Sequence, residues 1–471
     1  MPGRGSSLSV VAAALLILAA CEVGPDYRKP DALAPAAYKE SQGWKPAQPQ
    51  EAASGTAWWS VYDDPVLDQL EGQVAISNQT LKADEAAVRV ARALVVEARA
   101  GLFPTIGLGA SAQRARQGGS GGSFTGNQFA VSATASWDLD VWGRIRRSVE
   151  ASAANAQASA ADLAAARLSI QGELAADYFA LRTQDETARL LQATVALFQH
   201  SLEIARNKYE AGTTAMTDVA SAEAQLESTQ AQAINVGVQR QQLEHAIAVL
   251  IGRAPSDFAV APVPLTLKTP AVPTGLPSAL LERRPDIAAA ERQMAAANAE
   301  IGVAVAAFYP NISLSATASL AATALSSLFN ASNLIWAVGP ALSETLFEGG
   351  LRSAQLEAAH GTYDQQVALY RQIVLAAFQQ VEDQLAALRI LEQEAGVQAA
   401  AVRAAEEAAR LALNQYVGGT VDYTAVISAQ ANALGSEETS LGVLSQRAAA
   451  SVGLIQALGG GWDVSQLPAM Q

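Results

Sequence analysis

Few residues in this chain of 471 have the types and spacing that chemistry needs. The three histidines, His200, His245 and His360, fall in separate helical segments and lack the i, i+4 spacing of a metal-binding pair. No Walker-type phosphate loop is present, and the glycines of Gly118–Gly122 fall in an expected exposed loop, without the strand-to-helix context of a nucleophile elbow. The sequence therefore predicts no enzyme, no metal site and no cofactor.

The only cysteine, Cys21, stands where a covalent modification is expected. The apolar stretch Leu8–Ala20 before it is too short to span a membrane and is typical of a signal peptide. Leu18–Cys21 resembles a bacterial lipobox, which is cleaved before the cysteine; the cysteine then carries acyl chains that bury their CH₂ groups in the bilayer. Glu22 follows in place of the aspartate that retains lipoproteins at the inner membrane, so we expect an outer-membrane address. An unreactive, buried cysteine is the alternative.

The composition narrows the possible partners. The net charge is −14 and the sequence pI is about 4.8, whereas nucleic-acid binding needs a basic surface, so we expect no nucleic acid as a partner. After the signal peptide, no run of about 18 apolar residues could form a membrane-spanning helix. If the mature chain spans a membrane, a closed β-barrel is the remaining way to do so.

Four segments alternate between apolar and polar residues, as strands do. The clearest is Phe129–Val141, followed by Ile312–Leu320, Thr105–Gln113 and Leu334–Leu342. Their length suits tilted transmembrane strands of about 9–11 residues. We expect strands at about 104–113, 128–142, 310–320 and 332–343, joined in pairs by exposed loops at Arg114–Asn127 and Ala321–Ala331. A half-buried sheet of a soluble domain is the alternative, which is disfavoured because the flanking segments supply no second sheet.

Very long helical segments follow the strand pairs. Gly143 to about Tyr209 contains no proline and would run about 100 Å as one helix, and Leu351 to about Tyr416 is its counterpart. Shorter helices are expected from about Thr217 to Ile251 and from Thr424 to Leu458. Such lengths without a globular partner predict helices that pack against one another in coiled-coil fashion.

The chain repeats itself with an offset of about 206 residues. The sequence FPTI at Phe103–Ile106 returns as YPNI at Tyr309–Ile312, and VASAEA at Val219–Ala224 returns as VISAQA at Val426–Ala431. We therefore divide the chain into a signal peptide (1–20), an extended lipid-anchored segment (21–62), a first repeat (63–254), a proline-rich linker (255–280), a second repeat (281–460) and a C-terminal tail (461–471).

Four strands cannot close a barrel, for which about eight are the practical minimum. Open sheet edges are not tolerated in lipid, so several chains must share one barrel. Two chains would supply eight strands and three would supply twelve, and the strand count leaves both assemblies open.

Three ordered motifs resemble the TolC-like family of outer-membrane efflux factors, in particular its lipid-anchored OprM/NodT-like branch. They are Cys21–Pro30, the stretch from Trp58 to Asp64-Pro65, and Arg284–Gly302 followed by Tyr309-Pro310. The resemblance implies a homotrimer in the outer membrane, with a twelve-stranded β-barrel and a twelve-helix periplasmic barrel. It also implies docking with a periplasmic adaptor and an inner-membrane pump of the proton-driven RND type.

The function that the resemblance implies is passive conduction of small molecules or drugs from the pump and adaptor to the outside, through a gated tunnel. A type I protein-secretion channel of the same fold is the alternative, although the lipobox favours the pump-linked branch. A structural coiled-coil lipoprotein is a third hypothesis, which the two pairs of strands disfavour. Within the Arg284–Gly302 motif, Pro285 can open a helix that Asp286 caps, so we expect a structural role there and no site.

The turns that follow the two long helices should form the far periplasmic tip, which in this family meets the adaptor. Glycine suits such turns because it accepts positive φ. The docking candidates are Lys208, Tyr209, Gly212, Tyr416 and Gly419. The family often has arginine before the tyrosine; Lys208 and Gln415 stand there in this chain, which leaves the contact of the second turn open. Plain helix-ending glycines are the alternative.

Asp422 and Tyr423 directly follow the second turn and are the candidate gate residues. A like position in the family carries acidic residues that ring the entrance. Three Asp422 carboxylates near one axis would repel one another and would attract cations, and Tyr423 could plug the opening with its ring. The alternative is that Asp422 only caps the helix that follows.

Overall fold

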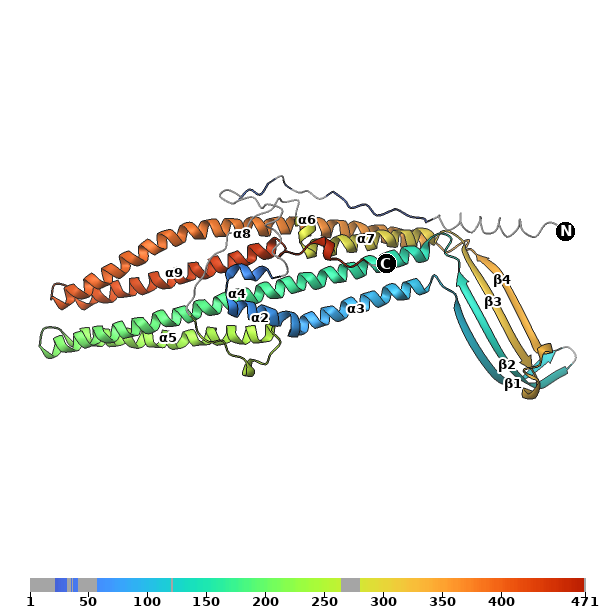
Figure 1. Cartoon of the computed structure of the whole chain (residues 1–471), viewed down its shortest axis with the longest axis horizontal. Helices are drawn as coiled ribbons and strands as arrows, with labels where there is room; N and C mark the ends of the chain where they lie inside the picture. Colours follow the sequence, from blue (N-terminus) through green and yellow to red (C-terminus); the bar gives the residue numbers. More distant parts are fainter. Residues whose placement is uncertain are drawn as a thin grey trace.

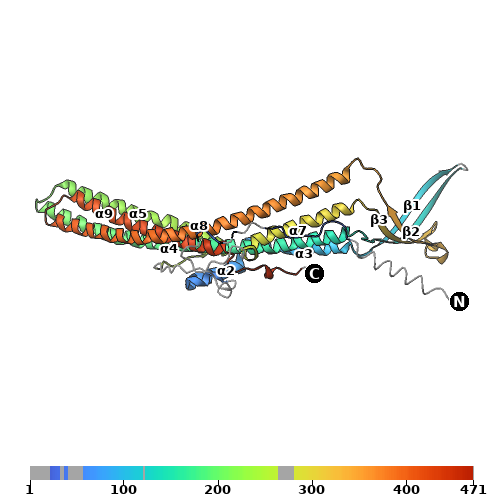
Figure 2. The same ribbon diagram turned by 90° about the horizontal axis from the view of Figure 1, so that it is seen from above.

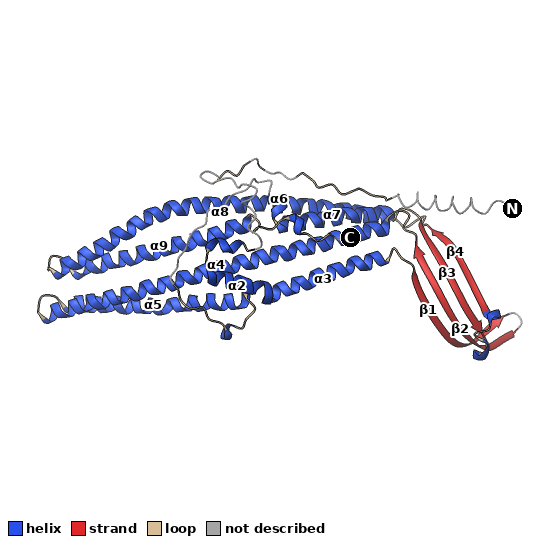
Figure 3. Cartoon of the chain, viewed as in Figure 1, coloured by secondary structure: helices blue, strands red, loops and turns tan. Residues whose placement is uncertain are grey.

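The structure is a computed structural model that describes residues 22–31, 35, 37–40, 57–119, 122–263 and 280–469. The predicted signal peptide, Cys21 and residues 264–279 of the predicted linker lie outside the described residues. The described chain is mainly helical, with a four-stranded sheet at one end (Figure 3). The predicted fold class, mainly α with a β part and two structural repeats, is confirmed.

Each repeat consists of two helices, a pair of strands, a long helix, a turn and a return helix (Figure 1). The first contains α2 (Pro65–Ser77), α3 (Gln79–Ala100), β1 (Thr105–Gly119), β2 (Gly122–Asp138), α4 (Arg144–Glu210) and α5 (Met216–Leu250). The second contains α6 (Leu280–Arg283), α7 (Pro285–Ala306), β3 (Asn311–Ala322), β4 (Leu334–Ser343), α8 (Leu351–Val417) and α9 (Tyr423–Ala457).

The long helices α4 and α8 have 67 residues each, which corresponds to about 100 Å, as predicted. Each begins after a glycine in the left-handed region, Gly143 with φ 81° and Gly350 with φ 92°. The Asp140 carboxylate accepts the backbone amides of Ile145 at 2.7 Å and Arg146 at 3.0 Å, so it satisfies two free amides in the first turn of α4. No helix formed by the described residues is both long and apolar enough to cross a membrane.

The sheet is an antiparallel meander in the order β1-β2-β3-β4. The predicted loop at Arg114–Asn127 is wrong, because Arg114 pairs with Asn127 and the ladder continues to Gly119 opposite Gly122. Gln113 and Gln128 face each other at the start of this extension and share a side-chain hydrogen bond of 2.7 Å. Cross-strand pairing satisfies the backbone there and outweighs the poor strand preference of a Gly- and Ser-rich segment.

The strand register gives the sheet two different faces. Strictly alternating positions of all four strands share an apolar face, which includes Ile106, Leu108, Val131, Leu320, Trp336 and Val338. The opposite face carries mainly serine, threonine and glycine, for example Gly107, Thr134 and Thr317. Leu108 is 82% exposed and Trp336 69% exposed, so nothing in the described chain covers the apolar face.

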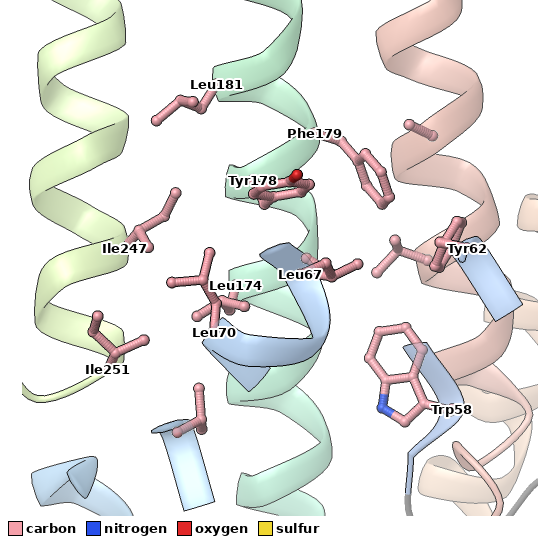
Figure 4. Packing of buried hydrophobic residues seen from close by; sticks show 14 of the residues in the cluster. Trp58, Tyr62, Leu67, Leu70, Leu174, Tyr178, Phe179, Leu181, Ile247 and Ile251 are labelled. Atoms are coloured by element: carbon pink, nitrogen blue, oxygen red, sulfur yellow. The ribbon is translucent and has the colours of Figure 1, made fainter. Parts of the chain in front are cut away.

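A core near the middle of the molecule holds both repeats together. The 3₁₀ turn Trp58–Tyr62 and α2 pack against α4, α5 and α9 (Figure 4). The Tyr178 hydroxyl donates to Asp64 at 2.6 Å, and Asp64 in turn caps α2 by accepting the amides of Val66 and Leu67. Glu71 of α2 is fully buried, and neither of its carboxylate oxygens has a hydrogen-bond partner among the described residues.

Helix α7 begins at Pro285 as predicted, but the predicted cap at Asp286 is wrong. Because Pro285 occupies the first helical position, the capping position falls to Arg284. The Asp286 carboxylate lies inside the first turn, where it accepts the Ile287 amide at 2.9 Å and pairs with Arg284 at 2.6 Å.

Candidate functional site at the two helical turns

The two turns that join α4 to α5 and α8 to α9 lie at the end of the molecule farthest from the sheet (Figure 1). They have the same backbone geometry. The amide of Thr213 donates to the carbonyl of Lys208 at 2.9 Å, and the amide of Thr420 donates to that of Gln415 at 3.0 Å. These bonds, with those from Gly212 and Gly419, form a Schellman motif at each helix end.

Gly212 and Gly419 adopt left-handed conformations, with φ of 71° and 74°. An added Cβ at either position would meet no atom within 4 Å. The predicted need for positive φ is therefore confirmed, and both glycines lie at an open surface. Tyr209, Met216 and Val417 expose large apolar side chains around the same two turns.

Lys208 connects the first helical hairpin, α4 and α5, to the second, α8 and α9. Its Nζ donates to the carbonyl of Tyr416 at 2.6 Å and lies 4.7 Å from the centre of the Tyr416 ring. A cation is favourable at the C-terminal end of a helix, where the last carbonyls lack partners, and also over an aromatic ring. Lys208, in the last turn of α4, therefore holds the C-terminal end of α8.

The rings of Tyr416 and Tyr423 are buried between the hairpins, 2% and 1% exposed, with their centroids 5.0 Å apart. Burial raises the pKa of both hydroxyls, that of Tyr423 to about 12, so both remain protonated. The Tyr416 hydroxyl lies 3.4 Å from Asp218 and 3.5 Å from Thr214, distances that are long for hydrogen bonds. The two tyrosines pack α8 and α9 onto the first hairpin.

The two candidate gate residues, Asp422 and Tyr423, differ in their exposure to solvent. Asp422 is exposed at the N-cap position of α9, but its side chain makes no capping hydrogen bond. The carboxylate therefore does not cap the helix, as the alternative interpretation of Asp422 required. Tyr423 points into the core of the tip, which does not fit the predicted plug in this conformation.

Four residues that contribute to the tip were not predicted from the sequence. Asp218 resembles an ordinary acid in the first turn of a helix, and Thr214 resembles an ordinary turn residue. The only available signal was the difference between the repeats, since Ala425 stands at the position equivalent to Asp218. Ser201 accepts a hydrogen bond from Gln430 at 3.1 Å inside the tip, and no motif marks either residue.

Comparison with known proteins identifies relatives over almost the whole chain. The solvent efflux pump outer membrane protein SrpC of Pseudomonas putida is 32% identical over 462 residues, which cover 96% of this chain and 98% of SrpC. Outer membrane protein OprJ of Pseudomonas aeruginosa is 31% identical over 476 residues, covering 98% and 97%. The solved structure of the outer-membrane channel OprN superposes with a TM-score of 0.89 at 31% identity, over 94% of this chain and 100% of OprN.

The model of the outer membrane efflux protein family matches residues 70–253 and residues 276–460, one stretch in each structural repeat. The chain therefore belongs to the outer membrane efflux protein family and is not an enzyme.

Proposed function

We propose that three copies of this chain form one outer-membrane channel, whose barrel is assembled from three four-stranded sheets. The observation that carries the proposal is the sheet, which has one apolar face and free edges at β1 and β4 within the described residues. In a bilayer the backbone groups of both edges need partners, and pairing β4 of one copy with β1 of the next supplies them. Twelve strands can enclose a water-filled passage lined by the serine, threonine and glycine face.

Uncovered apolar side chains on the helices support the same assembly. Figure 2 shows α8 separating from the other helices towards the sheet. On α8, Leu351 is 55% exposed and Leu375 is 50% exposed; on α3, Val90 is 60% exposed and Val96 is 67% exposed. Neighbouring copies that pack side by side would cover these side chains and form a periplasmic barrel of helices.

The channel conducts small organic molecules from the periplasm to the outside, together with a periplasmic adaptor and an inner-membrane pump of the proton-driven RND type. Relatives are named for efflux of antibiotics, solvents and toluene, which favours this cargo over the proteins of a type I secretion channel.

The exposed turns around Gly212 and Gly419 meet the adaptor. Three Asp422 carboxylates ring the inner entrance and favour cations there. A lipid on Cys21 anchors the chain to the outer membrane in addition to the barrel.

The assembly and the anchor can be tested together by mass spectrometry. Native spectra in detergent should show three copies per particle, and the intact mass of each chain should be that of residues 21–471 plus acyl groups. A stable monomer that conducts ions would contradict the shared barrel. A mature chain with an unmodified Cys21 would contradict the anchor and leave the barrel untouched.

Bulky side chains at the turns should block docking. Gly212→Leu together with Gly419→Leu is expected to abolish efflux in susceptibility assays while the trimer still assembles, because both side chains would project from an open surface. The matched control is the pair Gly212→Ala and Gly419→Ala. It carries the same strain of a side chain at positive φ, of about 1 kcal/mol per site, with little added bulk. Efflux that survives the leucine pair would show that these turns are not the adaptor surface.

A further inference from the structure

The segment that follows Cys21 is fixed to the helices at the end nearest the sheet. The amide of Val23 donates to the carbonyl of Trp142 at 3.2 Å, just before α4 begins. From there the segment runs along α7 towards the middle of the molecule (Figure 1). The amides of Lys39 and Glu40 then bind the Glu382 carboxylate of α8 at 2.7 and 2.9 Å. The segment thus contacts helices from both repeats.

A buried arginine of α4 organises the first part of this contact. The side chain of Arg147 is only 4% exposed, and its guanidinium pairs with Asp26 at 2.9 Å, Glu22 at 3.3 Å and Glu150 at 2.7 Å. It also donates to the carbonyl of Val23 at 3.4 Å. A buried cation needs such partners, and two of these three carboxylates belong to the N-terminal segment.

Helix α7 contributes three residues on one face, Glu291, Asn298 and Gly302, at spacings of seven and four residues. Asn298 donates to the carbonyl of Pro25 at 2.9 Å, and the Tyr27 hydroxyl donates to Glu291 at 2.8 Å. A Cβ on Gly24, whose φ is 96°, would lie 2.5 Å from the Gly302 Cα, so the two backbones approach as closely as glycine permits.

These contacts involve the part of the Arg284–Gly302 motif for which the sequence predicted no site. We propose that Arg147, Glu291, Asn298 and Gly302 form a docking track for residues 22–27, which fixes the lipid-bearing N-terminus directly to the channel helices at the membrane surface. The track gives this motif a binding role, with the chain's own N-terminal segment as its ligand. The lipid itself rests on the proposed function; the track does not.

The position of the docking track, at the end of the helices nearest the sheet, supports this role. Exposed aromatic side chains gather where the helices meet the strands, and Phe103, Phe308 and Phe347 are 68%, 42% and 89% exposed there. Aromatic residues concentrate at the interfaces of membrane proteins, where their apolar rings meet the headgroups. Glu22 is held beside Gly143 at this level, so the described segment reaches the proposed membrane surface while in contact with the helices.

Trypsin cleavage after Arg28 tests the track on the full-length protein in membranes. A protease needs several residues of extended, detached chain, so the cleavage rate reports how often residues 22–31 leave the helices. Gly302→Ala should raise this rate about tenfold or more, because the new Cβ would lie 2.8 Å from the Arg147 Cγ and displace the guanidinium from its partners. Gly24→Ala should raise the rate similarly and changes no residue of the helices.

The matched control is Gly435→Ala, a helical glycine whose added Cβ meets no atom within 4 Å and which should leave the rate unchanged. Equal cleavage rates in the control and in both track variants, all shown to be trimeric, would overturn the proposal. The mass of the released N-terminal fragment shows separately whether Cys21 carries acyl chains. Failure of the anchor and failure of the track are therefore distinguishable.

Discussion

Replacement of Glu71 by glutamine is expected to raise the temperature of unfolding at neutral pH. The Glu71 side chain is fully buried on α2, and in the part of the chain that the structure describes neither carboxylate oxygen has a hydrogen-bond partner. Burial raises the pKa of Glu71 from its ordinary 4.5 to about 9, because removal from water disfavours the charged form. Glu71 is therefore a neutral acid in the folded chain at pH 7.

The pH dependence follows from the sign of this shift. Between pH 4.5 and about pH 9 the folded chain keeps the proton on Glu71, whereas the unfolded chain releases it. The free energy of unfolding therefore falls as the pH rises through this window, by up to about 1.4 kcal/mol per pH unit. Glutamine has the same shape and no proton to lose. The variant should gain about 3 kcal/mol over the wild type at pH 7 and lose this advantage as the pH falls towards 4.5.

Thermal unfolding followed by circular dichroism at several pH values between 4.5 and 8.5 measures this difference, with variant and wild type compared at the same pH and as intact trimers. Asp68→Asn is the control, because Asp68 is an exposed acid on the same helix and should change the unfolding temperature little. A Glu71→Gln variant that is no more stable at pH 7 would contradict the assignment of Glu71 as a neutral acid without a partner. A gain that does not vary with pH would assign the effect to packing.

Those parts of the fold that depend on local pattern could be predicted from the sequence. The proline-free stretch from Gly143 to about Tyr209 predicted α4, and Pro285 predicted the start of α7. Both predictions agree with the structure to within a residue or two. Alternation located all four strands, although β2 ends at Asp138 and not near residue 142 as predicted, and the repeat ordered the strands in two pairs. Each of these features depends on the backbone preferences of neighbouring residues, so the sequence carries it directly.

The features that could not be predicted depend on residues far apart in the chain. The strand extension beyond Gln113 requires a partner strand in register, and composition alone indicated a loop. Lys208 could be assigned to a turn, but its bond to Tyr416 joins residues 208 positions apart. The contact of Gly24 with Gly302 likewise needs the tertiary structure, because no local pattern distinguishes a glycine that receives a backbone from one in a loop.

Replacement of Lys208 by methionine is expected to raise the resting conductance of the channel about tenfold. Lys208 ties the first hairpin to the end of α8, through its 2.6 Å bond to the Tyr416 carbonyl and its position over the Tyr416 ring. In the proposed channel the tip is the gate, so any movement that opens it by separating the hairpins must break this tie. Hydrogen bonds to charged groups contribute about 1.5–3 kcal/mol, and 1.4 kcal/mol corresponds to a tenfold change in the population of an open state.

Single-channel recordings of trimers in planar bilayers measure the change. Arg206→Met is the matched control, because it removes the same charge from the same end of α4, whereas the ion pair of Arg206 with Glu223, at 3.6 Å, lies within the first hairpin. Asp422→Ala should lower the preference for cations with little effect on resting conductance, since the Asp422 side chain makes no capping bond. If Lys208→Met abolishes efflux and leaves resting conductance unchanged, then Lys208 acts on the adaptor and the tie across the tip does not hold the channel shut.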